Sequence, residues 1–294
     1  MKTVENRYDF VYLFDCQDGN PNGDPDSDNS PRVDPETFQG LVSDVCLKRK
    51  VRNYVLQSHI VGGRVEEGYD VFVLAGASLE SRQRLPYDHF KLAEGKDSIE
   101  QARDWMCKNF YDVRAFGAVM STKNFNCGQV RGPVQLTFAR SIDRVFATEH
   151  AITRVAYTQE AKKEASSGTT EMGRKHTVAY GLYRAHGFIN PVFAEQTGFS
   201  EDDLADLWSA LRSLFDLDRS AARGLMAARG LYIFKHDSRL GSAPASQLFE
   251  AIKIKLKDGV VIPRSFSDYV VMVPDAAAFP GVSMINGLPA AATV

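Results

Sequence analysis

The amino-acid sequence predicts a mixed fold of the α+β class, with an antiparallel sheet favoured over a doubly wound α/β arrangement. Segments that alternate like β-strands interleave with segments of helical period, and the two clearest strands, residues 151–158 and 176–183, flank one polar stretch. A composition of 44% hydrophobic and 24% charged residues over 294 positions is typical of a globular protein with one elaborated domain or two.

The first expected strand covers residues 7–14 and is predicted to be buried on both faces. An aromatic stripe in a strand could stack nucleic-acid bases, but core packing is the favoured interpretation. The aromatic residues of one face are Tyr8, Phe10, Tyr12 and Phe14, and the other face carries Val11 and Leu13.

The later elements follow from the same two periods. Residues 37–58 are predicted as a helix with Pro35 and Thr37 at its start, and residues 75–97 as irregular polar chain. The remaining expected elements are strands at 69–74, 132–142, 151–158, 176–183 and 231–236, helices at 99–110 and 201–215, a mixed segment at 246–256 and a tail at 287–294.

Several classes of protein are disfavoured. No signal peptide is expected at the start of the chain, and no stretch approaches the roughly 18 apolar residues of a membrane span. The four cysteines are far apart and form no C-x-x-C pair, so we expect reduced thiols in a cytoplasmic protein with no membrane contact. No zinc-ligand spacing and no G-x-S-x-G motif occurs, and residues 168–175 form a broken phosphate loop, so no metal or cofactor is expected.

Charge is distributed unevenly along the chain, although the formal net charge is only −2. Residues 15–36 hold seven acids against one arginine, whereas residues 128–187 hold nine bases against five acids. Local fields matter more to a charged ligand than the total, so the basic middle remains compatible with a polyanionic partner.

The acidic stretch begins with the loop QDGNPNGDPD, residues 17–26, which could serve a metal, a turn or a partner's backbone. Residues 18–23 match the start of an EF-hand loop, but Asn29 stands where a bidentate Glu should close the cage. Its prolines, Asn and Asp favour successive turns in which side chains accept backbone hydrogen bonds. The loop is therefore interpreted as structural or interfacial.

Two short segments carry weak nucleic-acid signals. Lys48, Arg49 and Arg52 share the expected helix with Lys50, and this basic face is either solvated or directed at phosphates. Residues 114–119 partly match the RNP1 run of RNA-recognition modules, but Ala118 stands where a stacking aromatic is expected.

Seven short motifs follow one another along the chain: NPNGDPD (20–26) with Pro31-Arg32, LKRKVR (47–52), VRAFG (113–117), GQVRGPVQ (128–135), Ser141-Ile142-Asp143, Tyr180-Gly-Leu-Tyr183 and Ser220-Ala-Ala-Arg223-Gly224. Taken together and in this order, they resemble one family, the backbone subunit of the type I-C CRISPR surveillance complex (Cascade), in the RAMP superfamily. The resemblance covers nearly the whole chain. One departure is Arg144, where many relatives have proline, which affects only a local turn.

The resemblance implies a hand-shaped protein without catalytic residues of its own. A palm with a modified RNA-recognition (ferredoxin-like) fold would cover residues 1–74, 111–158 and 176–294, with helical fingers at about 75–110 and a thumb hairpin at about 153–180. Copies would stack head to tail along the CRISPR guide RNA and support recognition of a target DNA strand. The implied partners also include a guide-processing subunit, a large subunit, a small subunit and a recruited helicase-nuclease.

Candidate guide contacts carried over from the motifs, with the thumb residues added, are Arg32, Lys48, Arg49, Arg52, Arg114, Ser121, Lys123, Gln129, Arg131, Gln135, Lys162, Lys163, Met172, Arg174 and Lys175. In the thumb, residues 159–175 would cross the guide, with the four cations on phosphates and Met172 as an apolar wedge beside an unstacked base. A disordered surface loop is the alternative for this segment.

The rival function is a metal-dependent ribonuclease of the same superfamily. Relatives in type III systems cleave target RNA with an acid of the loop after the first strand. Asp15, Asp18, Asp24 and Asp26 lie in the corresponding region, and two carboxylates near a phosphate would suffice to hold magnesium.

Overall fold

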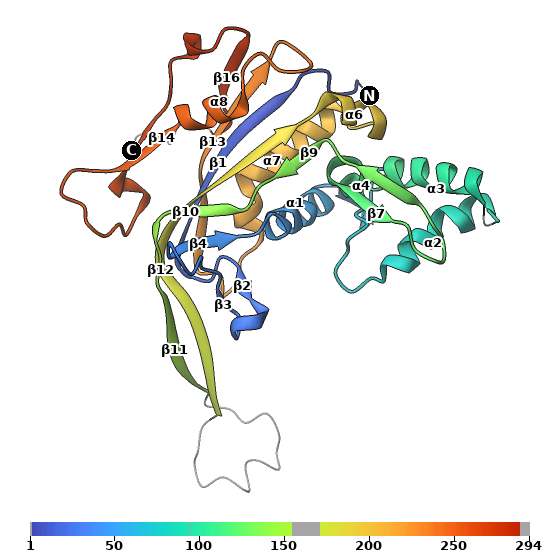
Figure 1. Cartoon of the computed structure of the whole chain (residues 1–294). Coiled ribbons are helices and arrows are strands. Elements are labelled where there is room, and N and C mark those ends of the chain that lie inside the picture. The colour runs from blue at the N-terminus through green and yellow to red at the C-terminus, as the bar shows by residue number, and fades with distance from the viewer. Residues whose placement is uncertain (1, 94, 155–170, 289–294) are drawn as a thin grey trace, which may run out of the picture.

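The long strands of the molecule form one antiparallel sheet (Figure 1). The structure is a computed structural model that describes residues 2–93, 95–154 and 171–288. The eight-stranded sheet has the order β16-β13-β1-β12-β10-β4, and β9 and β11 also pair with β12. The predicted α+β class with an antiparallel sheet is therefore confirmed. The strands are β1 (Tyr8–Gly19), β4 (Gln39–Val42), β9 (Val134–Leu136), β10 (Ala139–Arg144), β11 (Ala147–Arg154), β12 (Glu171–Ile189), β13 (Leu225–His236) and β16 (Val282–Asn286).

Strand β1 is the centre of the fold, because β12 and β13 pair with its two edges and side chains cover both its faces. Its aromatic residues belong to the larger core, whereas Val11 and Leu13 belong to a second core on the opposite face. Phe10 packs edge-on against Trp208 at 5.1 Å between ring centroids, and Phe14 stacks on Tyr183 at 5.4 Å. The aromatic stripe of β1 is therefore part of the hydrophobic core, which confirms the prediction of core packing.

Two helices cover the aromatic face of the sheet, α1 (Asp44–Ser58) and α7 (Glu201–Leu217), with the short α6 (Pro191–Thr197) beside them (Figure 1). Helix α7 begins with a capping box in which Ser200 and Asp203 bond each other's backbone N–H groups. The opposite face carries α8 (Ala245–Ala251) and the two-stranded ribbon of β14 (Lys253–Leu256) and β15 (Tyr269–Met272).

A separate helical lobe projects from the sheet (Figure 1). It contains α2 (Leu79–Phe90) and α3 (Lys96–Asn109), followed by α4 (Tyr111–Phe116) and the ribbon of β7 (Gly117–Met120) and β8 (Gly128–Arg131). Its own apolar core includes Phe72, Met106, Phe110 and Met120.

A long hairpin of β11 and β12 projects away from the sheet on another side (Figure 1). The ladder pairs Ala147 with Val178 and continues to Arg154 opposite Glu171. The paired strands expected around residues 151–158 and 176–183 are confirmed up to Arg154, and residues 155–170 lie outside the described part of the chain.

Three predictions of local structure are wrong. Residues 39–42 form β4 and not the start of a helix, because the helix begins only after Ser43, whose side chain caps α1. Gly40 of this strand packs tightly against Tyr183, since a Cβ at position 40 would lie 2.6 Å from the tyrosine hydroxyl. Residues 69–74 contain only an isolated bridge at Asp70, because the Asp112 carboxylate takes the backbone N–H groups that a neighbouring strand would bond. Residues 79–90 form α2 despite Pro86 inside it.

The elements that complete the fold are short. The strands among them are β2 (Gly23–Asp24), β3 (Ser30–Pro31), β5 (Ile60–Val61) and β6 (Arg64–Val65), and the 3-10 turns are η1 (Pro25–Ser27), η2 (Phe266–Asp268) and η3 (Ala276–Ala278). All four cysteines carry free thiols. Within residues 2–93, 95–154 and 171–288, no helix is both long and apolar enough to span a membrane.

Candidate nucleic-acid interface

The β7–β8 ribbon exposes one of its faces to solvent. Its register pairs Gly117 with Arg131 and Val119 with Gln129, so these side chains share one face, and Val119, Gln129 and Arg131 are exposed. Ala118 lies on the other face with the core of the helical lobe. The partial RNP1 match therefore fails for a physical reason, because its central position points into the protein.

Helix α1 divides its cations between two environments. Lys48 pairs with Asp44 at 3.0 Å and Arg52 pairs with the buried Asp112 at 2.7 Å, and both cations lie over the ring of Phe116. Arg49 is exposed, and its guanidinium has no ion-pair partner within the described residues. Of the basic face expected here, Arg49 is the side chain left available to a phosphate.

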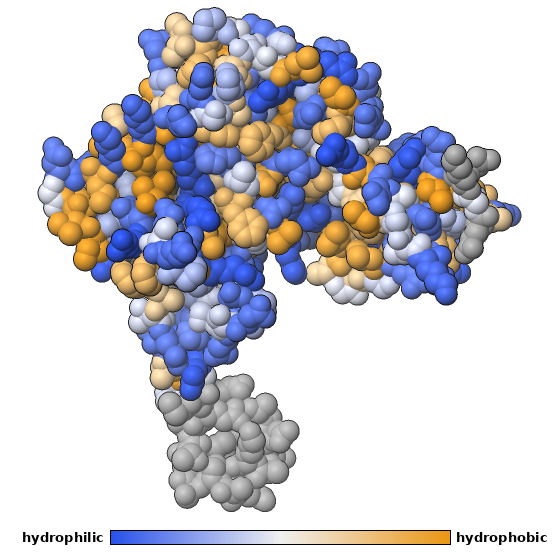
Figure 2. All heavy atoms as spheres, viewed as in Figure 1, coloured by the Kyte–Doolittle hydropathy of each residue, from blue (hydrophilic) through white to orange (hydrophobic). Residues whose placement is uncertain are grey.

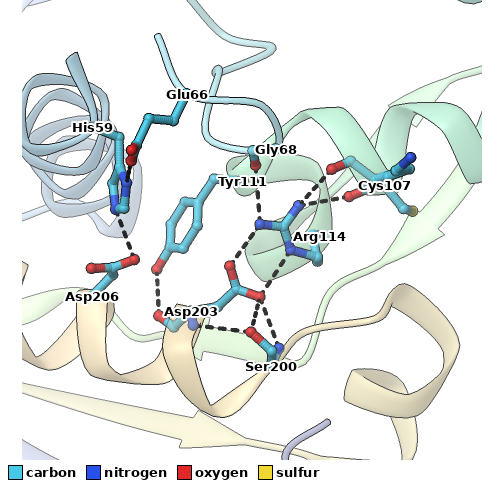
Figure 3. Close-up of polar contacts among 10 residues, drawn as sticks. His59, Glu66, Gly68, Cys107, Tyr111, Arg114, Ser200, Asp203 and Asp206 are labelled. Atoms are coloured by element: carbon cyan, nitrogen blue, oxygen red, sulfur yellow. Dashed lines mark hydrogen bonds and ion pairs between the residues drawn. The ribbon is translucent and has the colours of Figure 1, made fainter. Parts of the chain in front are cut away.

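Arg114 is the centre of a buried polar network (Figure 3). Its guanidinium holds both carboxylate oxygens of Asp203, at 2.9 and 2.6 Å, and donates to the carbonyls of Gly68, Cys107 and Lys108. The side chain is 8% exposed. The Arg114 donors are thus already used inside the protein, which favours a structural role, and a guide contact of Arg114 stays a prediction.

A second polar cluster lies beside this network, in which His59 is bonded to Asp206 of α7 (Figure 3). The His59 ring lies between Glu66, at 2.6 Å from Nδ1, and Asp206, at 3.0 Å from Nε2, and it stacks on Tyr69 at 3.5 Å. No local motif in the sequence marks this cluster, because Asp206 is far from His59 along the chain.

The loop after β1 is held by its own side chains. Asn22 Oδ1 accepts hydrogen bonds from the backbone N–H and the hydroxyl of Ser43, which joins the loop to the N-terminus of α1. Asp24 caps η1 through the N–H of Asp26 and pairs with Arg32 at 3.4 Å. The predicted turns with Asn and Asp as acceptors are thus confirmed, and the half-buried Arg32 has a partner inside the loop.

Asp15 occupies a different environment from the rest of the acidic stretch. It is 2% exposed, and one carboxylate oxygen accepts from Arg229 at 2.8 Å and from Tyr180 at 3.1 Å. Burial raises the pKa of the Asp15 carboxyl, and Arg229 opposes part of this shift. In the described ranges, no three His, Cys, Asp or Glu side chains converge as a metal site.

The hairpin carries two of the predicted thumb cations within the described residues. Arg174 is exposed and pairs with Glu149 across the strands at 3.2 Å, and Lys175 lies opposite His150. Lys162 and Lys163 fall outside the described residues. The structure gives only the backbone of Met172, as part of β12.

The surface is hollowed between the hairpin and the helical lobe (Figure 2), and α1 lies between these two elements (Figure 1). Arg131 lies with its guanidinium 5.0 Å from the ring centroid of Phe193, a residue that the sequence motifs did not single out. Of the predicted contact residues whose side chains the structure describes, seven are exposed: Arg49, Ser121, Lys123, Gln129, Arg131, Gln135 and Arg174.

Comparison with known proteins identifies the family. A family model described as "CRISPR-associated protein Cas7" matches residues 6–274. The chain belongs to this family. A CRISPR-associated protein Cas7 of Haloferax volcanii is 29% identical over an alignment of 238 residues. The match covers 72% of this chain and 66% of that relative, just under two thirds of its length.

Solved structures give weaker matches. A chain of a "CRISPR RNA-guided surveillance complex, pre-nicking" superposes with a TM-score of 0.48 at 16% identity, covering 78% of both chains. A chain of a "Type III-B Cmr-beta bound to cognate target RNA" gives a TM-score of 0.42 at 11% identity, covering 78% of this chain and 61% of the other. The family level of the predicted resemblance is confirmed, whereas the type I-C assignment stays a prediction.

Proposed function

We propose that this Cas7-family chain is the non-catalytic backbone subunit of a type I-C surveillance complex. It binds the CRISPR guide RNA, forms an oligomer along the spacer and supports recognition of complementary double-stranded DNA in antiviral defence. The observation that carries the proposal is the set of exposed Arg, Lys, Gln and Ser side chains on α1 and the β7–β8 segment, in a chain of this family.

These side chains suit a sugar-phosphate backbone. Arg49, Lys123 and Arg131 supply charge that attracts RNA of any sequence, and Gln129 and Gln135 supply hydrogen bonds without charge. The Gln135 amide is already oriented by the carbonyl of Gly132, to which it donates at 3.1 Å. Such an interface holds a guide independently of its spacer sequence, as a common backbone subunit must.

We assign the parts of the expected hand to elements of the fold as follows. The sheet with α1, α6 and α7 is the palm, and α2 and α3 are the fingers. The β11–β12 hairpin is the thumb, with Arg174 and Lys175 near the guide and Lys162, Lys163 and Met172 completing it. The exposed acids of residues 26–36 face a neighbouring copy in the head-to-tail stack or a basic subunit of the complex. Such an assembly works in the cytoplasm and needs no cofactor.

The buried position of Asp15 favours this proposal over the metal-dependent ribonuclease. Arg229 and Tyr180 occupy one carboxylate oxygen of Asp15, and Asp24 is used by η1 and Arg32. Two of the four acids that the ribonuclease would use are therefore engaged in holding the fold. A magnesium-dependent cleavage assay on target RNA with the guide-bound protein separates the two functions, and we expect no cleavage.

The interface is tested with the triple variant Arg49→Ala, Lys123→Ala and Arg131→Ala. Guide affinity should fall about equally for unrelated spacers, and the slope of log Kd against log salt should flatten by about 0.7 per lost phosphate contact. The control is Arg84→Ala, an exposed residue that pairs with Asp88 on α2. A loss confined to one spacer sequence would contradict the phosphate-backbone assignment.

A further inference from the structure

The β14–β15 ribbon displays a row of lysines that the proposed guide interface does not use. Lys253, Lys255 and Lys257 alternate with Ile254 and Leu256. The three lysines are exposed, whereas Ile254 and Leu256 pack against the second core of the molecule. One face of the ribbon therefore closes the core, and the other presents three ammonium groups to solvent.

The row lacks acidic partners. None of the three lysines forms an ion pair within the described residues, whereas many surface cations elsewhere do, for example Arg84, Arg219 and Arg239. The nearest acids in the sequence are Glu250, three residues before Lys253, and Asp258, in the following turn, and neither forms an ion pair with the row within the described residues. The Asp268 carboxylate accepts the backbone N–H groups of Arg264 and Ser265, and these bonds, with Lys257 nearby, hold its pKa below the ordinary value.

The ribbon lies on the other side of the sheet from α1 and α7 (Figure 1), over the second core. Arg49, on α1, belongs to the opposite side. A polyanion bound to the lysine row would therefore be a different molecule, or a different segment, from the guide bound beside α1.

We propose that the β14–β15 ribbon binds the phosphate backbone of double-stranded DNA. The inference rests on the proposed function, in which the assembly meets a DNA duplex, and it adds a second surface to each subunit. Lysines two residues apart on a strand are spaced by about 6.6 Å, close to twice the roughly 3.4 Å axial spacing of phosphates along one DNA strand. Each ammonium is a point charge that attracts phosphate without reading sequence.

Two different roles for such a row of lysines predict different outcomes. Lysines on a short two-stranded ribbon could serve only to prevent edge-to-edge association, in which case their removal would promote aggregation and leave DNA binding unchanged. An acidic protein could also use the row together with the exposed Val270 and Met272, which lie opposite Lys255 and Lys253. Loss of the lysines would then release a protein subunit and not a nucleic acid.

The test uses the guide-loaded assembly carrying Lys253→Ala, Lys255→Ala and Lys257→Ala. Binding of a duplex DNA without complementarity to the guide is measured by fluorescence anisotropy over a salt range of about 50 to 200 mM. We expect at least about ten-fold weaker binding, and a slope of log Kd against log salt that falls by about 2.7 for each copy in contact. A duplex RNA of the same sequence is measured in parallel.

The charge-matched control removes Arg84, Arg103 and Lys108, three cations of the helical lobe that pair with acids. The Kd of this control for duplex DNA should stay within about two-fold of the wild-type value. The control changes the net charge by the same amount as the lysine variant, but it leaves the row of unpaired lysines in place. Unchanged DNA binding in the lysine variant overturns the inference, as does weaker binding of the RNA duplex alone or loss of a protein subunit. The ratio of absorbance at the nucleic-acid maximum to that at the protein maximum reports the guide content of the purified variant. This ratio should stay unchanged, so a failure of the present inference can be told apart from a failure of the proposed function.

Discussion

The substitution Arg114→Met tests whether this arginine holds the fold or the guide. Methionine keeps much of the side-chain length and removes the charge and all the donors. Asp203 would then remain buried, at 1% side-chain exposure, without its cation. Its remaining bonds are those from the backbone N–H and hydroxyl of Ser200.

The magnitude follows from the cost of an uncompensated charge. Removing one partner of a buried ion pair costs about 3–5 kcal/mol. The carbonyls of Gly68, Cys107 and Lys108 also lose a donor, but they add little, because they border a cavity of about 490 Å³ that admits water. Asp203 borders the same cavity, which favours the lower end of this range. We therefore expect the free energy of unfolding to fall by about 3–5 kcal/mol.

The assay is urea unfolding of the full-length chain followed by circular dichroism, with Asp203→Asn and the double variant measured beside the single one. The double variant should be less destabilised than the sum of the two single variants, with a coupling of at least about 1 kcal/mol. Arg49→Ala is the control, since an exposed side chain without an ion-pair partner in the described residues should change stability by less than about 0.5 kcal/mol.

A structural role for Arg114 would be refuted if Arg114→Met unfolded at the wild-type urea midpoint while its guide affinity fell with a flatter salt dependence. That pattern would place the guanidinium on a phosphate and not on Asp203. The opposite pattern, a lower midpoint with an unchanged salt slope for the folded fraction, is the one we expect.

Three further predictions address thiols, pH and the hairpin. Burial raises the pKa of Cys16 and Cys127 to about 12 and that of Cys107 to about 11. Iodoacetamide at pH 8 should therefore label the native protein only at Cys46, as detected by mass spectrometry. Rapid labelling of Cys127 would contradict this prediction. Burial beside Arg184 lowers the pKa of His186 from 6.5 to about 4 in the folded protein. As the pH drops from 6.5 to about 4, the unfolded chain takes up a proton at this residue before the folded chain does, so the free energy of unfolding should fall. In urea titrations His186→Gln should show a shallower dependence of this free energy on pH, and an unchanged dependence would refute the assignment to His186. In the third prediction, residues 151–174 are replaced with an Asn-Gly turn between His150 and Lys175, which face each other in the ladder. The free energy of unfolding should change by less than about 1 kcal/mol, since the side chains of the removed segment that the structure describes, at positions 151–153, 173 and 174, are exposed. The same replacement should abolish any regular pattern of reactive, flipped-out bases in chemical probing of the loaded complex, and an unchanged pattern would show that the thumb lies elsewhere.

The sequence was most informative where local pattern and tertiary packing agree. Residues 7–14 alternate strictly, and β1 buries both faces as that alternation requires. Helix α7 and the strands of the hairpin were predicted for the same reason.

Prediction failed where distant groups decide the local structure. Residues 69–74 have strand composition, but the Asp112 carboxylate, about forty positions away, takes their amides. Arg114 fits a nucleic-acid motif, yet its guanidinium pairs with Asp203, which no short-range pattern connects to it. Arg52 likewise forms an ion pair with Asp112, so only part of the basic helix face predicted from the sequence is free to bind a phosphate in the folded protein.

The central claim is that copies of this chain assemble along a guide RNA. The most direct measurement is the mass of complexes purified with guides of increasing spacer length, determined by size-exclusion chromatography with multi-angle light scattering. We predict that the mass rises in steps of one chain plus the added nucleotides, with an absorbance ratio that shows bound RNA at every length. A protein mass that does not change with spacer length, or a complex that carries no RNA, would contradict the claim.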